Sequence, residues 1–400
     1  MIAQASYIPP LDELGIPSPY WLFLVLMAVT LLLHLLFMNY VLGGTLVAIG
    51  LNVRAMLRPA ARAESNRLAT LIFQAIPVAI SFAITAGVAP LLFVQVLYAP
   101  YFYTSSIMLG FVWLSMVGLL IVGFYMAYLV ANRGTNALLG RTGRWDDKPG
   151  RRLLVTLLAA ACFLAIGWIL TNTHVLSILA DLGHWARDDR WRQNVLYAGH
   201  RTVVPRLLHF IIGALAVSGM WIAAVGWWRR SRGLDGEEAS AGTIRLGLWI
   251  TLIGSCLNVL AGIAFLFHHD WAIVSALFRL GHWAGLLFAA AVFVLVPAHL
   301  ATVLLAIRTP RSFRTFLLAA AVLAALALLM VVGREHLRLI HLARPENGTF
   351  SLAYWVVRPQ GSPLALFLVI FVAGLATVAV MLRWMSRRPT EPAPPPSETA

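Results

Sequence analysis

The amino-acid sequence predicts an all-α protein, a polytopic transmembrane helical bundle of about nine spans. Hydrophobic residues make up 60% of the 400-residue chain and charged residues only 12%, against about 25% charged residues in a soluble domain. Apolar runs of about 20 residues, the length that crosses the hydrocarbon core, recur along the whole chain. Strand-like alternation is absent, which argues against a membrane barrel.

Nine apolar runs are long enough to be spans. In chain order they are 21–53, 69–98, 105–132, 153–181, 203–228, 244–267, 280–307, 315–333 and 363–383. Several exceed 25 residues, so these helices must tilt or project beyond the bilayer. We therefore expect one transmembrane bundle over 1–388. The Pro-rich polar ending, 389–400, predicts a disordered cytoplasmic tail.

Basic residues gather in alternate segments between the spans. Twenty of the 30 Lys and Arg residues lie in the segments that are inside if the N-terminus is outside. The positive-inside rule therefore predicts an N-out, C-in orientation in a bacterial inner membrane, with lipid around the bundle. The net charge of +14 could suggest nucleic acid, but clusters at span ends are explained by topology, so no nucleic-acid partner is expected.

Ten of the eleven histidines fall toward the predicted outer side, and only His299 belongs to the inner half. Ionisable groups inside a membrane are costly, so each is a candidate functional group. Imidazole is also a common axial ligand of haem iron. We interpret four of them as iron ligands: His34, His209, His282 and His341. The alternative for any single membrane histidine is a hydrogen bond between helices. No C-x-x-C-H motif is present, so covalent haem attachment is not expected.

Arginines accompany these histidines on the outer side, against the positive-inside trend. Arg206 and Arg279 each precede a candidate ligand by three residues, about one helical turn. Haem propionates are anionic and Arg binds carboxylates bidentately, so Arg206, Arg279 and Arg334 are candidate propionate contacts. Lipid headgroups and neighbouring aspartates are the alternative partners.

Acidic residues are missing from the middle of every predicted span. Proton-coupled membrane enzymes usually carry buried Asp or Glu as relays. Because oxygen reduction consumes protons, this pattern argues against a complete oxygen reductase. It also argues against an ion-coupled transporter.

Four segments contain the candidate ligands: LLLHLLFMNYVLGGTLVAI, RLLHFIIGALAVSGMWIAAVGWW, ALFRLGHWAGLLF and VGREHLRLIHLARP. With SFAITAGVAPLLFVQV, they resemble segments of subunit I of cytochrome bd quinol oxidases, and the resemblance covers nearly the whole chain. It implies nine spans with the N-terminus outside and haems near the outer face. It also implies that His34 binds a high-spin haem and His209 a low-spin haem. His282 stands at or beside a Met ligand of that family, and His341 stands at a Glu ligand.

The chain also departs from that family. Phe93 replaces an acidic residue, the acidic residues expected in 105–132 are absent, and the outer loop of the quinol site shrinks to HHDWAIVSALF. The family signature G-R-Q-P-W becomes G-R-E-H-L at 333–337. The resemblance thus implies a retained haem scaffold and a lost proton route and quinol loop.

Three functions remain open from the sequence. The first is a b-type cytochrome with two or three haem b groups. It would transfer electrons between a quinone pool or membrane partner and a periplasmic cytochrome c or other redox subunit. The second is a bd-type terminal quinol oxidase that reduces oxygen. The third is a haem-free membrane transporter or assembly factor.

Overall fold

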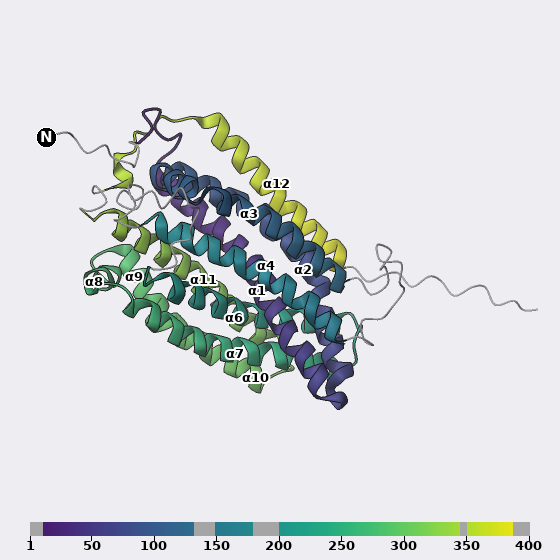
Figure 1. The fold of residues 1–400 in the computed structure, drawn as a ribbon. Coiled ribbons are helices and arrows are strands. Elements are labelled where there is room, and N and C mark those ends of the chain that lie inside the picture. The colour runs from purple at the N-terminus through teal and green to yellow at the C-terminus, as the bar shows by residue number, and fades with distance from the viewer. Residues whose placement is uncertain (1–10, 132–148, 179–199, 345–349, 387–400) are drawn as a thin grey trace, which may run out of the picture.

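The computed structural model describes residues 11–131, 149–178, 200–344 and 350–386. Within these ranges, nine helices are long and apolar enough to cross a membrane. They lie side by side along a common direction (Figure 1). The predicted helical membrane bundle is confirmed, while its orientation stays a prediction. The predicted tail 389–400 and His184 lie outside the described residues.

The helices follow the predicted order. Their bounds are α1 (Tyr20–Leu57), α2 (Arg62–Leu97), α3 (Ala99–Ala131), α4 (Pro149–Leu176), α6 (Val203–Ser231), α7 (Glu237–Phe267), α8 (Trp271–Leu277), α9 (Trp283–Ala290), α10 (Val296–Arg308), α11 (Phe313–Leu342) and α12 (Gly361–Ser386). A π-helical segment, Ala291–Leu295, joins α9 to α10, and these three pieces form one span. The short helix α8 lies between the spans of α7 and α9.

The end of the eighth span was predicted nine residues too early. The apolar run of the eighth span ends at residue 333, and the sequence placed His336 and His341 beyond it, whereas α11 continues to Leu342. Both histidines therefore lie on the last turns of this helix. The helix continues because its polar residues are not solvated as in a loop: Glu335 and Arg338 are buried and pair with each other.

Alternating helix directions give the bundle two different ends. The beginnings of α1 and α6 and the ends of α4, α7 and α11 meet at one end, on the left of Figure 1. We call it the histidine-rich end, because His174, His209, His269 and His341 lie there. The turn between α6 and α7 lies at the opposite end.

Close packing of small residues holds the middle of the bundle together. A Cβ atom added at Gly219 of α6 would lie 2.5 Å from the carbonyl oxygen of Gly247 in α7. A Cβ atom added at Gly43 of α1 would lie 2.2 Å from the carbonyl oxygen of Ala214 in α6. Such backbone contact is the usual way in which helices associate in lipid, where apolar side chains have no preference for each other over lipid tails.

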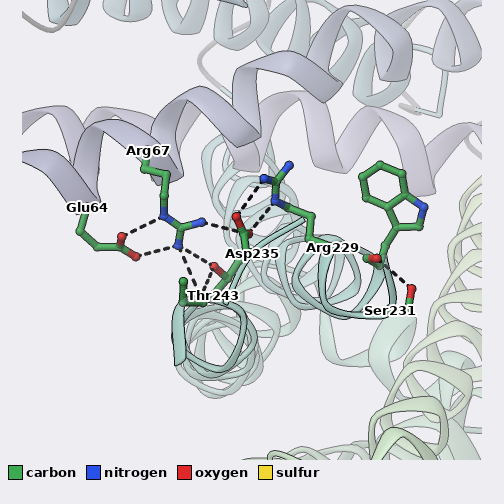
Figure 2. Close-up of polar contacts among 8 residues, drawn as sticks. Glu64, Arg67, Arg229, Ser231, Asp235 and Thr243 are labelled. Carbon is green, nitrogen blue, oxygen red and sulfur yellow. Dashed lines mark hydrogen bonds and ion pairs between the residues drawn. The ribbon is translucent and has the colours of Figure 1, made fainter. Parts of the chain in front are cut away.

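Figure 2 shows an ion-pair network at the opposite end of the bundle. Asp235, in the α6–α7 turn, accepts hydrogen bonds from Arg229 Nε at 2.6 Å and from Arg67 Nη1 of α2 at 3.2 Å. Arg67 also donates to Thr243 of α7 at 3.0 Å. Hydrogen bonds from Arg229, with its charge and that of Arg67, lower the pKa of Asp235. This contribution to stability is therefore present above about pH 4, and is lost as the pH falls below the unfolded-state pKa.

We expect Asp235→Asn to lower the stability of the detergent-solubilised protein by about 1–2 kcal/mol, because two guanidinium groups lose their carboxylate. Thermal unfolding at a fixed scan rate measures the change. The matched control is Glu237→Gln in the same turn, whose side chain is 62% exposed and pairs with Arg230 and Arg311. A Tm loss in the control as large as that in Asp235→Asn would contradict this account.

Candidate functional site

A cluster of charged residues lies where α4 and α11 meet at the histidine-rich end; Glu335 and Arg338 are buried, whereas the Arg334 side chain is 34% exposed. Arg334 Nη1 donates to Glu335 Oε1 at 2.6 Å, and Arg338 Nη1 lies 3.2 Å from Glu335 Oε2. Both arginines also point a guanidinium nitrogen at His174 Nδ1, at 3.4 and 3.1 Å. Because guanidinium groups only donate, Nδ1 must be the acceptor, and His174 is neutral with its proton on Nε2. Glu335 is then the one negative charge of this cluster.

Arg206 of α6 adds a third positive charge. It lies within electrostatic range of Arg334, Arg338 and Glu335. Its Nε and Nη2 atoms are buried and make no hydrogen bond to any described residue, while its guanidinium group lies 4.8 Å from the centre of the Phe265 ring. Among the described residues, three arginines against one glutamate leave an excess of two positive charges. Uncompensated buried charge is strongly unfavourable, so this site suits an anionic ligand with carboxylate groups.

His34 lies in the first half of α1 and faces α2. Its Nδ1 atom lies 2.7 Å from the carbonyl oxygen of Ala83, and this acceptor requires the proton to be on Nδ1. The lone pair is then on Nε2, the arrangement of most metal-ligating histidines. Gly87 makes room for the ring, since a Cβ atom there would lie 2.7 Å from His34 Nδ1.

His209 lies in the second turn of α6 and packs against α7. Its Nδ1 atom is buried and faces the backbone of Asn258, without a well-formed hydrogen bond to any residue in the described ranges. Gly262 leaves space beside the ring, with an added Cβ 3.1 Å from its Cε1 atom. His209 also stacks on Phe265 at 6.3 Å, so His209 and Arg206 share one aromatic neighbour.

His282 and Arg279 are placed differently, since both are exposed. His282 is the N-cap of α9, where its Nδ1 accepts a hydrogen bond from the backbone of Ala284 at 3.3 Å. Its ring stacks on His336 of α11, with centroids 4.9 Å apart and planes at 4°. Neither His282 nor Arg279 takes part in the cluster of Arg334, Glu335 and Arg338.

His341 is buried in the last turn of α11, and its ring contacts that of His269, just beyond the end of α7, at 5.6 Å. The structure thus brings Arg206 and Arg334 together. Four residues that sequence reasoning did not assign to the site also lie there: His174, His269, Glu335 and Arg338. The spacing Arg334, Arg338, His341 is a helical i, i+4, i+7 pattern and could have indicated one shared face, had the helix been extended past residue 333.

No protein-family model matches the chain, and neither does any curated protein sequence. Among solved structures, the bd oxidase from Geobacillus thermodenitrificans is similar, with a TM-score of 0.67 and 13% sequence identity. The match covers 93% of this chain and 99% of that chain. At this identity the likeness concerns the fold. It confirms, at that level, the resemblance to the bd oxidases that the sequence indicated.

Arg206→Met should have opposite effects on the protein without and with a bound carboxylate ligand. Without an anion, replacing an unpaired guanidinium group by an apolar side chain of similar length should stabilise the fold by on the order of 1–4 kcal/mol. With a bound carboxylate ligand, the same change should weaken ligand retention. Thermal unfolding, and the amount of haem retained after incubation with haem as the probe, measure the two effects. The control is the exposed Arg279→Met. Equal effects of both variants would show that burial of Arg206 is irrelevant.

Proposed function

We propose that the chain is a membrane b-type cytochrome resembling the large subunit of bd oxidases. It transfers electrons between a quinone pool or membrane partner and a periplasmic redox partner, a cytochrome c or another redox subunit. The main support is the excess of two positive charges among the described residues around Arg206, two of whose guanidinium nitrogens are buried, next to histidines with buried ring nitrogens. A haem group would satisfy both features, because its two propionates balance the positive charge and its iron binds imidazole nitrogen.

The proposed cofactors at the histidine-rich end are two or three haem b groups. His34, His209, His282 and His341 are the proposed iron ligands, and Arg206 and Arg334 the proposed propionate contacts. Arg279 is the third proposed contact, although it is exposed in the structure. The Nε and Nη2 atoms of Arg206 support this fit, because they are buried and make no hydrogen bond within the described ranges, whereas buried polar groups normally have partners. When bound, haem supplies one-electron chemistry at its iron, and the chain sets orientation, burial and axial ligation.

The chain's own residues would tune the potential. The contact of His34 Nδ1 with Ala83 fixes the ring so that its Nε2 lone pair faces away from α2. Histidine in place of Met or Glu is expected to lower the potential of a haem iron, since axial ligand identity and burial set it. On the predicted orientation, these groups lie near the periplasmic face of a bacterial inner membrane, where an outer redox partner could approach.

A second candidate, the bd-type terminal quinol oxidase, is favoured by the fold likeness. The distribution of carboxylates opposes it. Among the described residues, Glu335 is the buried carboxylic acid, and it is held in ion pairs with Arg334 and Arg338.

The test is a dithionite-reduced minus oxidised spectrum of the purified protein, followed by carbon monoxide. We expect a b-type band in the wild type, and loss of most of it in the double variant His34→Ala, His209→Ala. Oxygen uptake with quinol and carbon monoxide binding by a high-spin haem would favour the oxidase. A colourless, folded wild type would overturn the proposal and favour a haem-free transporter or assembly factor.

A further inference from the structure

His269 and His341 form a buried pair of imidazoles from two distant parts of the chain. His269 lies two residues beyond Phe267, the last residue of α7, and His341 lies in the final turn of α11. Their exposed fractions are 8% and 9%, and their ring centroids are 5.6 Å apart with the planes at 61°. Two imidazole rings from separate helix ends therefore meet in a site with little exposure to solvent.

One ring nitrogen of His269, Nδ1, is hydrogen-bonded, and the other, Nε2, is not. Its Nδ1 lies 3.0 Å from the carbonyl oxygen of Phe265, so Nδ1 carries the proton and Nε2 carries a lone pair. This Nε2 atom is buried and has no hydrogen-bond partner within the described ranges. A backbone carbonyl behind the ring and a lone pair in front is the usual arrangement of a metal-ligating histidine.

A second pair of contacting histidines, His282 and His336, serves as a comparison. These rings are parallel and stacked face to face, 4.9 Å apart at 4°. Because the nitrogen lone pair lies in the plane of the ring, two rings stacked in this way point their lone pairs past each other, not at one shared atom. The ring planes of His269 and His341 are inclined at 61°, so their lone pairs are not forced past each other and can point at one shared atom.

We propose that His269 and His341 are the two axial ligands of one haem, with Arg206 binding a propionate of the same group. This inference rests on the proposed function and assigns one ligand pair within it. With metal–imidazole bonds of about 2 Å on opposite sides of one atom, the ring centroids lie roughly 6 Å apart, close to the 5.6 Å observed. Phe265 links the two proposed contacts, since its ring lies 4.6 Å from that of His269 and beneath the Arg206 guanidinium group.

The binding step needs no co-reactant. Nε2 of neutral His269 already has its lone pair, so forming the dative bond to iron releases no proton and transfers no electron. Two imidazole ligands, one from His269 and one from His341, would fill both axial positions of the iron. The haem would then be six-coordinate and low-spin, with no site for an external ligand. The pair therefore predicts an electron-transfer haem in this position.

The test compares His269→Ala with His268→Ala. His268 is the matched control, because its Nδ1 makes the same bond to the carbonyl four residues earlier, Ala264 at 2.7 Å, while its side chain is exposed. We expect His269→Ala to lose one low-spin ferric signal in electron paramagnetic resonance, and its reduced form to bind carbon monoxide at that haem. His341→Ala should do the same, and His268→Ala should match the wild type.

A second variant, His269→Met, covers the case in which the alanine variant does not fold. It should keep six ligands and raise the midpoint potential of one haem, because Met/His ligation raises it. An intact low-spin signal in His269→Ala, or an unchanged set of potentials in His269→Met, overturns the ligand pair while leaving the proposed function standing. Absence of haem from the wild type overturns both.

Discussion

The excess of positive charge buried at the histidine-rich end is the constraint on which the rest of the structure depends. Arg206, Arg334 and Arg338 come from α6 and α11, and Glu335 supplies the one carboxylate among them. His174 accepts from two of the guanidinium groups but brings no charge. Positive charge without a partner is costly in a partly buried site, so this excess favours binding of a compensating anion between these helices.

The spans were predictable because bilayer thickness sets the length of an apolar helix. The same logic misplaced the end of α11, where hydropathy falls at Gly333 while the helix continues for nine residues. Pairing of Glu335 with Arg338 within α11 sustains those turns, together with contacts of Arg334 and Arg338 to His174, about 160 positions away along the chain. Hydropathy is a local quantity and has no access to a contact of that sequence separation.

The sequence could predict which residue types form the candidate site, but not which of those side chains face the interior of the bundle. The sequence indicates that His34 and His209 lie among apolar neighbours, and the structure places both against a glycine of an adjacent helix. It could not indicate that His282 faces outward and caps α9, or that His269 turns inward one residue after the exposed His268. Consecutive residues at a helix end point in directions about 100° apart, and only packing decides which one is buried.

The most direct measurement is a cryo-electron microscopy map of the protein as purified from its native membrane. The account predicts planar density among α6, α7 and α11, with a carboxylate within hydrogen-bond distance of the Arg206 guanidinium group. Side chains packed as described, with only a lipid phosphate or water beside Arg206, would contradict it.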